Sequence, residues 1–196
     1  MRKLEKVCVY CASSQQANSE YAQAAFQLGE IFAQNEITVV NGGGAVGLMG
    51  ALADGAIAAG GKVVGIIPQF MVDLEWAHPN ISELIIVETM HERKEQMIQG
   101  VDAVVALPGG SGTFEELFEA ITWKRLGLYV NPIILLNTKN YFEPCLNLLS
   151  NCVKEKFMDE RHRDIWAVAE TPNEVIPAIL KAPAWSVHAR QFAALH

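Results

Sequence analysis

The segment LPGGSGTFEEL, residues 107–117, places three glycines, two hydroxyl side chains and two carboxylates close together. A glycine-rich turn that opens a helix is suited to binding an anion, because backbone N–H groups point outwards there and the helix dipole favours negative charge. The hydroxyl of Thr113 stands at the predicted start of this helix. Residues 108–113 are therefore predicted to form a phosphate cradle.

Two carboxylates, Glu115 and Glu116, follow the cradle directly and fall in the predicted first turn of the helix. The helix dipole alone favours acidic residues in a first turn, and most acidic residues there have no further role. Two carboxylates beside an anion site, however, repel the anion. We therefore expect one of the two to face solvent or a partner and the other to take part in chemistry.

A second glycine-rich segment, NGGGAVGLMG at residues 41–50, contains a formal GxGxxG. The dinucleotide fingerprint follows the first strand of its unit and precedes, by about twenty residues, an acid that binds a ribose hydroxyl. Here the segment follows the second predicted strand, and the next strand ends in Pro68 and Gln69 without an acid. NAD and FAD are not expected, and Lys62 has the wrong spacing for a P-loop. A turn for close backbone approach and a loop that only needs glycine dihedrals remain as interpretations.

The elements that must position these residues alternate between strand and helix. Apolar, β-branched runs predict strands at 7–10, 37–40, 63–67, 84–87, 103–106, 133–136 and, more weakly, 166–168. Helices are predicted at 19–34, 47–59, 90–100, 113–126, 141–157 and 172–180. Continuous apolar strands alternating with helices indicate a doubly wound parallel α/β sheet, in which ligands bind where the strand-to-helix loops gather. We expect one domain over residues 1–182 and a C-terminal arm over 183–196.

Composition excludes several classes of function. The 196 residues fit one domain, and a formal net charge of -7 argues against a nucleic-acid surface. No apolar run is long enough to span a membrane, and the first residues lack the apolar core of a signal peptide, so a cytoplasmic protein is expected. The four cysteines suit a reducing compartment. Cys8 and Cys11 fall in a predicted strand and are interpreted as core residues rather than a redox pair, and Cys145 and Cys152 as packing residues on one helical face.

Three motifs together are typical of one family. PGGSGTFEE at 108–116 fits the pattern PGGxGTxxE, and GGGAVGLMG at 42–50 and MHERKEQM at 90–97 complete the set. On these motifs, from CASS at 11–14 to ITWKRLG at 121–127, the chain resembles the Lonely Guy (LOG) family, cytokinin riboside 5′-monophosphate phosphoribohydrolases once mislabelled lysine decarboxylases. The resemblance implies a Rossmann-like fold and a homodimer with active sites near the subunit interface. It also implies hydrolysis of adenine-type nucleoside 5′-monophosphates to free base and ribose 5-phosphate.

The resemblance also assigns residues. The family's catalytic pair falls on Arg93 and Glu116. Its substrate-binding positions fall on Glu75, Lys94, Gly109, Gly110, Ser111, Gly112, Thr113, Phe114, Glu115 and Thr122. Ser111 stands where plant-like members often carry Tyr, a difference that concerns pocket contacts rather than the cradle. No metal and no cofactor are implied.

The assigned residues suit glycosidic hydrolysis. The bond between ribose and base breaks through a cation-like sugar, which a carboxylate such as Glu116 would stabilise while activating a water. A guanidinium stays charged, so Arg93 is expected to hold phosphate or ribose oxygens or to orient Glu116, and not to act as a general acid. Glu115 would bind a ribose hydroxyl or serve the helix dipole.

Alternatives remain open from the sequence. Met49, Met90 and Met97 either line a pocket for a substituent on adenine N6 or pack in the core, so the choice between cytokinin nucleotides and AMP is not made. A non-catalytic nucleotide or cofactor carrier would use the same cradle without needing Arg93 and Glu116 together. A decarboxylase would need a Schiff-base lysine and a pyridoxal site, whereas Lys94 beside the cradle is better interpreted as an anion contact.

Overall fold

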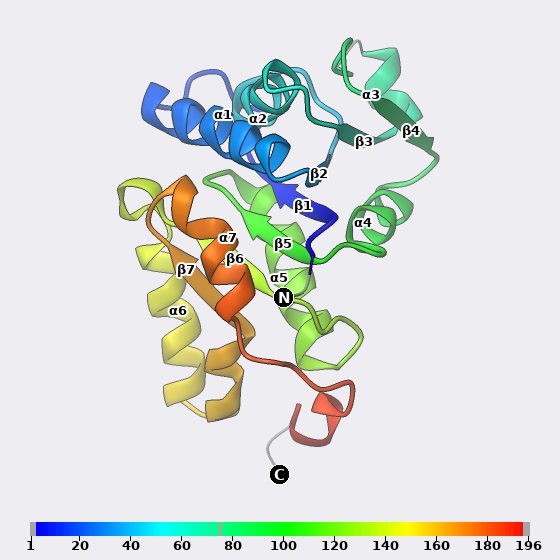
Figure 1. Ribbon diagram of the computed structural model, residues 1–196. Coiled ribbons are helices and arrows are strands. Elements are labelled where there is room, and N and C mark those ends of the chain that lie inside the picture. The colour runs from blue at the N-terminus through cyan, green and yellow to red at the C-terminus, as the bar shows by residue number, and fades with distance from the viewer. Residues whose placement is uncertain (1–2, 75, 194–196) are drawn as a thin grey trace.

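The computed structural model describes residues 3–74 and 76–193 (Figure 1). They form a single α/β domain around a seven-stranded sheet in which all neighbouring strands are parallel. The strands are β1 (Lys6–Tyr10), β2 (Thr38–Asn41), β3 (Val63–Pro68), β4 (Glu83–Val87), β5 (Ala103–Ala106), β6 (Ile133–Leu136) and β7 (Trp166–Ala169). Their order across the sheet is β4-β3-β2-β1-β5-β6-β7. The predicted doubly wound fold is confirmed.

Helices cover both faces of the sheet, as Figure 1 shows. They are α1 (Ser19–Gln34), α2 (Gly47–Ala58), α3 (Gln69–Asp73), α4 (Met90–Ile98), α5 (Ser111–Arg125), α6 (Glu143–Lys154) and α7 (Pro172–Lys181), with 3₁₀ turns η1 (Thr138–Asn140), η2 (Glu160–Ile165) and η3 (Ala189–Phe192). One apolar cluster joins α1, α2 and α7 to the sheet, and a second joins α4, α5 and α6 to its other face. Strands buried from both sides explain their continuous apolar sequences.

The chain reverses its winding direction between two neighbouring strands. Strand β1 leads into α1 on one face, whereas β5, which pairs with β1, leads into α5 on the other. The loops after β1 and β5 therefore diverge at the carboxyl ends of these strands. In doubly wound sheets this switch point is where ligands bind.

Some predicted boundaries were wrong. Helix α5 begins at Ser111 with Gly110 as its N-cap, two residues earlier than predicted, so the first turn holds no acidic residue and Glu115 and Glu116 lie in the second turn. Gly110, Ser111 and Gly112 have weak helix propensity. The cap and first turn of a helix tolerate such residues better than its interior does. The short helix α3 after β3 was not predicted, since five residues are too few for a periodic pattern.

The cysteines have the structural role that the sequence indicated. Cys8 packs in the cluster with α4, α5 and α6, and Cys11 packs in the cluster on the opposite face. Burial, and next the nearby charge of Glu116, raise the pKa of both thiols. All four cysteines lie within the described residues, and none of them forms a disulfide bond.

The C-terminal residues after α7 pack against the end of α5. The Trp185 Nε1 donates a hydrogen bond to the Lys124 carbonyl at 2.6 Å, and Arg125 Nε donates to the Ala193 carbonyl at 2.8 Å. Residues 194–196 of the predicted arm lie outside the described residues, and the boundary placed after residue 182 stays a prediction. Within the described ranges, no helix is both long and apolar enough to cross a membrane.

Candidate active site

Three loops meet at the carboxyl edge of the sheet. Ala12, after β1, donates a backbone hydrogen bond to the Pro108 carbonyl after β5 at 3.3 Å. The Ala12 carbonyl in turn accepts from the backbone N–H of Met49, which follows the first glycine-rich loop, at 3.1 Å. The two glycine-rich segments of the sequence therefore lie side by side at the switch point.

The loop before α5 leaves its helix N-terminus open. Helix α5 has no side-chain cap, whereas α1 and α4 are capped by Asn18 and Thr89. Ser111 and Gly112 are exposed, and the space around Gly110 and Gly112 is empty out to 4 Å from an added Cβ. Uncapped backbone N–H groups with open space beside them, at the positive end of a helix dipole, fit the predicted phosphate cradle.

Contacts behind the cradle hold it in place. The Thr113 side chain is buried against Gly109, where an added Cβ would lie 2.1 Å from Thr113 Oγ1. The Tyr141 hydroxyl donates to the Gly109 carbonyl at 2.5 Å, and the Tyr141 ring stacks with that of Phe114. The hydroxyl of Thr113 thus packs against the loop, and Phe114 belongs to a half-buried aromatic group rather than to an open surface.

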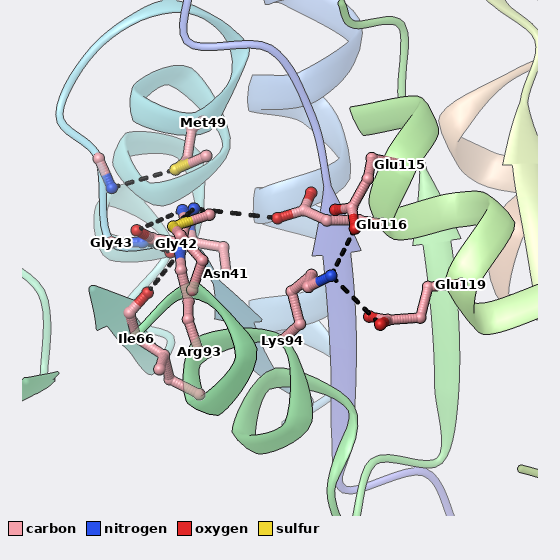
Figure 2. A network of polar contacts seen from close by, with 12 residues as sticks. Asn41, Gly42, Gly43, Met49, Ile66, Arg93, Lys94, Glu115, Glu116 and Glu119 are labelled. Carbon is pink, nitrogen blue, oxygen red and sulfur yellow. Dashed lines mark hydrogen bonds and ion pairs between the residues drawn. The ribbon is translucent and has the colours of Figure 1, made fainter. Parts of the chain in front are cut away.

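Arg93 is fixed by two backbone carbonyls. Its side chain is buried, with Nε donating to the Ile66 carbonyl and Nη2 to the Gly42 carbonyl, each at 3.0 Å (Figure 2). A Cβ at position 42 would lie 1.9 Å from Arg93 Nη2. The first glycine-rich loop therefore has a specific structural requirement: Gly42 leaves the space that the guanidinium occupies. This finding favours the close-approach interpretation of the loop.

Glu116 faces this guanidinium from α5. Its Oε1 lies 4.0 Å from Arg93 Nη1, at the outer limit of an ion pair, and both side chains are at least nine-tenths buried. Burial raises the pKa of Glu116 from 4.5 to about 7, although the positive charge of Arg93 acts in the opposite direction. At this separation the attraction does not offset desolvation. The carboxyl group can therefore both accept and release a proton near neutral pH.

Lys94 forms its hydrogen bonds with two other carboxylates of α5. Its buried ammonium donates to the carboxylates of Glu115 and Glu119, the latter at 3.2 Å. Burial lowers the pKa of Lys94, but the hydrogen bonds that it donates to Glu115 and then to Glu119 raise it, and the net direction is upward. Figure 2 shows the division: Arg93 points to Glu116, and Lys94 points to the other two carboxylates. Lys94 therefore binds two carboxylates of α5, whereas the sequence analysis interpreted it as an anion contact beside the cradle.

The other predicted positions are less closely grouped. Thr122 is exposed two turns further along α5, where its hydroxyl donates to the Phe118 carbonyl at 2.7 Å. Glu75 lies outside the described residues. Among the methionines, Met97 is a core residue, Met90 is exposed, and the Met49 sulfur accepts from the Gly44 N–H at 3.0 Å.

Several residues of the site were not predicted from the sequence. Gly42 and Ile66 contribute carbonyls, which leave no side-chain signal. Glu119 stands four residues after Glu115, a spacing that places both on one side of a helix and could have indicated a shared partner. Asn41, at the end of β2, is buried, and its Oδ1 accepts from the Gly43 N–H at 2.8 Å. Within the described residues, no group of three His, Cys, Asp or Glu side chains is placed to hold a metal ion.

Comparison with known proteins adds independent findings. A family model described as "Possible lysine decarboxylase" matches residues 49–179. The cytokinin riboside 5′-monophosphate phosphoribohydrolase LOG3 of Arabidopsis thaliana is 39% identical over 174 residues, which cover 89% of this chain and 81% of that protein. The probable enzyme of the same name, LOGL6, of Oryza sativa subsp. japonica is 38% identical over 174 residues, covering 89% of this chain and 70% of that protein.

Solved structures share the fold. The molybdenum cofactor binding protein of Rippkaea orientalis superposes with a TM-score of 0.68 at 24% identity, covering 92% of this chain and 97% of that one. The molybdenum cofactor carrier protein of Chlamydomonas reinhardtii has a TM-score of 0.70 at 19% identity, covering 91% and 98%. At these identities the likeness concerns the fold alone.

Proposed function

This chain belongs to the LOG family of cytokinin riboside 5′-monophosphate phosphoribohydrolases, and we infer that it hydrolyses the N-glycosidic bond of a nucleoside 5′-monophosphate, releasing the free base. The observation that carries the mechanism is the buried pair of Arg93 and Glu116 beside the open N-terminus of α5. A binding protein would need only the open helix end. A carboxyl group with a pKa near 7 next to it is suited to proton transfer.

The cradle binds the 5′-phosphate in this proposal. Backbone N–H groups of Gly109, Gly110, Ser111, Gly112 and Thr113 provide the donors, and the dipole of α5 provides the positive potential. Glu116 lies one turn further along the same helix. A phosphate held at the helix end would therefore place the ribose beside this carboxyl group.

Glu116 acts on the sugar and the water. Its carboxylate stabilises positive charge that develops at the anomeric carbon and takes a proton from the attacking water. The hydroxyl group bonds to the anomeric carbon, the electron pair of the glycosidic bond leaves with the base, and the base takes up a proton. Arg93, held by two carbonyls, fixes the position of Glu116 and presents Nη1 to oxygens of the substrate.

The remaining assigned positions have supporting roles. Phe114 packs against Tyr141 behind the cradle, and Glu115 accepts a hydrogen bond from Lys94. Lys94 is buried and already donates to two carboxylates, so we assign it to ordering the site. Glu75 keeps its assigned substrate contact as part of the proposal.

Thr122 supports a homodimer. Six residues separate it from Glu116, which corresponds to about 9 Å along a helix axis and a different side of the helix. A nucleotide held at Glu116 therefore faces a different side of α5 from Thr122 of the same chain. If Thr122 contacts the substrate, it does so in the site of a second copy.

The cradle predicts that the 5′-phosphate is required. Without the charge-assisted hydrogen bonds at the helix end, kcat/KM is expected to fall about a hundredfold or more. The experiment is chromatography after incubation with AMP, isopentenyladenosine monophosphate and the two matching nucleosides. Free base from the monophosphates alone supports the proposal, and the faster monophosphate identifies the preferred substrate.

Two results would contradict it. Nucleosides hydrolysed as fast as their monophosphates would show that the cradle is not a phosphate site. Intact nucleotide retained on the protein, with no release of base, would support the non-catalytic carrier instead.

A further inference from the structure

Two adjacent basic residues of α4 divide three carboxylates of α5 between them. Arg93 faces Glu116, and Lys94 donates to Glu115 and Glu119 (Figure 2). Glu115 and Glu119 stand four residues apart on one helix, where like charges repel each other. The Lys94 ammonium, buried between them, offsets this repulsion.

Glu119 is the more sheltered of the two carboxylates that bind Lys94. Its side chain is 29% exposed, against 55% for Glu115. Water competes more strongly for an exposed carboxylate, so the bond between Lys94 and Glu119 is the better protected from solvent, although Glu115 makes the shorter contact. An ammonium has three donors, and without Glu119 the flexible Lys94 side chain would be freer to approach Glu116 on the neighbouring turn.

We propose that Glu119 is a positioning residue for Glu116: by holding the Lys94 ammonium it leaves Glu116 to face Arg93 alone. The inference rests on the proposed function only for its consequence in catalysis. Its electrostatic consequence is independent of any reaction. Removing the charge of Glu119 takes a negative charge away from the surroundings of Glu116 and weakens the bond that holds the Lys94 ammonium, and both changes favour the Glu116 carboxylate.

Glu116 is influenced by groups from each element packed around it. These are Arg93 and Lys94 on α4, Glu115 and Glu119 on α5, and Cys8, Tyr10 and Cys11 on and after β1. The buried thiols and the phenol have raised pKa values and remain neutral around pH 7. The balance at Glu116 is therefore set by burial and by the charged side chains of α4 and α5.

The test is Glu119→Gln, which keeps the size of the side chain and an oxygen that accepts from Lys94. The matched control is Glu95→Gln, on α4, where the exposed side chain is not among the groups that shift the pKa of Glu116. The pKa of Glu116 is measured by carbon-13 NMR on protein labelled at glutamate carboxyl carbons. The signal is assigned by its loss in Glu116→Gln.

We expect Glu119→Gln to lower the pKa of Glu116 by roughly half a unit or more, and Glu95→Gln to leave it unchanged. The acid limb of log kcat/KM should move to lower pH by the same amount. An unchanged Glu116 pKa in folded Glu119→Gln, even with reduced stability, would overturn the proposal and leave Glu119 a structural residue. A shifted pKa in a protein that hydrolyses no nucleotide would support the positioning role and contradict the proposed function.

Discussion

The environment of Glu116 disfavours the charged form of its carboxyl group. Burial raises its pKa from 4.5 to about 7, against the opposing influence of Arg93. Between these two values the folded protein holds a proton that the unfolded chain has released. The free energy of unfolding therefore falls as pH rises from about 4.5 to about 7. Above pH 7 the full destabilisation by the buried charge of Glu116 is present.

Glu116→Gln should for this reason stabilise the protein at high pH. A neutral amide of the same size avoids burying a charge, and the free energy of unfolding at pH 8 should rise by on the order of 1–3 kcal/mol. At pH 4 the carboxyl group is protonated in both states, and little change is expected. Urea denaturation at both pH values measures the difference. An equal effect at the two pH values would show that the charge of Glu116 is not the cause.

The same substitution should lower turnover. Glu116→Gln removes the negative charge that the sugar cation needs, and kcat should fall about a hundredfold or more while nucleotide affinity holds or rises. Arg93→Ala should weaken both binding and turnover, because in the proposed mechanism its guanidinium orients Glu116 and contacts the substrate. Base release gives kcat, and calorimetry gives Kd. Near-normal turnover in Glu116→Gln with an inactive Glu115→Gln would show that the catalytic glutamate had been assigned wrongly.

The side chains of the candidate site were easier to predict from the sequence than the groups that surround and orient them. Arg93 and Glu116 were found through motifs, and the structure places them together. The carbonyls of Gly42 and Ile66, which aim Arg93, depend on how β2 and β3 approach α4, and no local pattern records that approach. The bonds of Lys94 to two carboxylates likewise arise from the packing of α4 on α5.

At the scale of elements, the order of strands and helices was predictable from the sequence, whereas the residues at which they begin and end were not. Buried strands such as β5 and β6 are continuous apolar runs, so their positions follow directly from composition. Helix α5 starts two residues earlier than predicted because the capping conformation of Gly110, and not side-chain preference, sets its start. That shift moves both glutamates from the first turn of the helix to the second.

The C-terminal segment, the described residues after α7, packs against the C-terminal end of α5. Gly127 is the residue that permits this contact. Its φ is +73°, and an added Cβ would lie 2.4 Å from the Val187 carbonyl. Gly100 is a matched control, because its φ is +68° but open space surrounds it. Gly100→Ala should lower the free energy of unfolding by about 1–2 kcal/mol through backbone strain alone. Gly127→Ala should lower it further, because Val187 must also move.

Denaturation in urea compares the two variants, and limited proteolysis reports on the segment. Cleavage between residues 182 and 193 should accelerate in Gly127→Ala and not in Gly100→Ala. Equal losses of stability with no change in cleavage would show that the segment contributes nothing to the position of α5.

At the scale of the whole molecule, two exposed apolar side chains follow the C-terminal end of α5. Leu126 and Leu128 are 39% and 70% exposed just beyond Thr122. Exposed apolar side chains grouped in this way are typical of an interaction surface. A second copy on this surface would bring its own Thr122 towards the proposed site beside Glu116, from which Thr122 of the same chain faces away.

We predict a homodimer, with a mass by light scattering twice the 21.5 kDa of one chain at micromolar concentration. The shared site has a sharper test in mixed subunits. Glu116→Gln and Thr122→Arg each damage both sites of their own homodimer. In a mixed dimer, one site carries both changes and the other carries neither. Co-expressed subunits with different affinity tags should therefore recover about half of the wild-type activity per dimer, if sites form as Thr122 implies. A monomer in solution, or a mixed dimer no more active than the average of the two variants, would contradict the prediction.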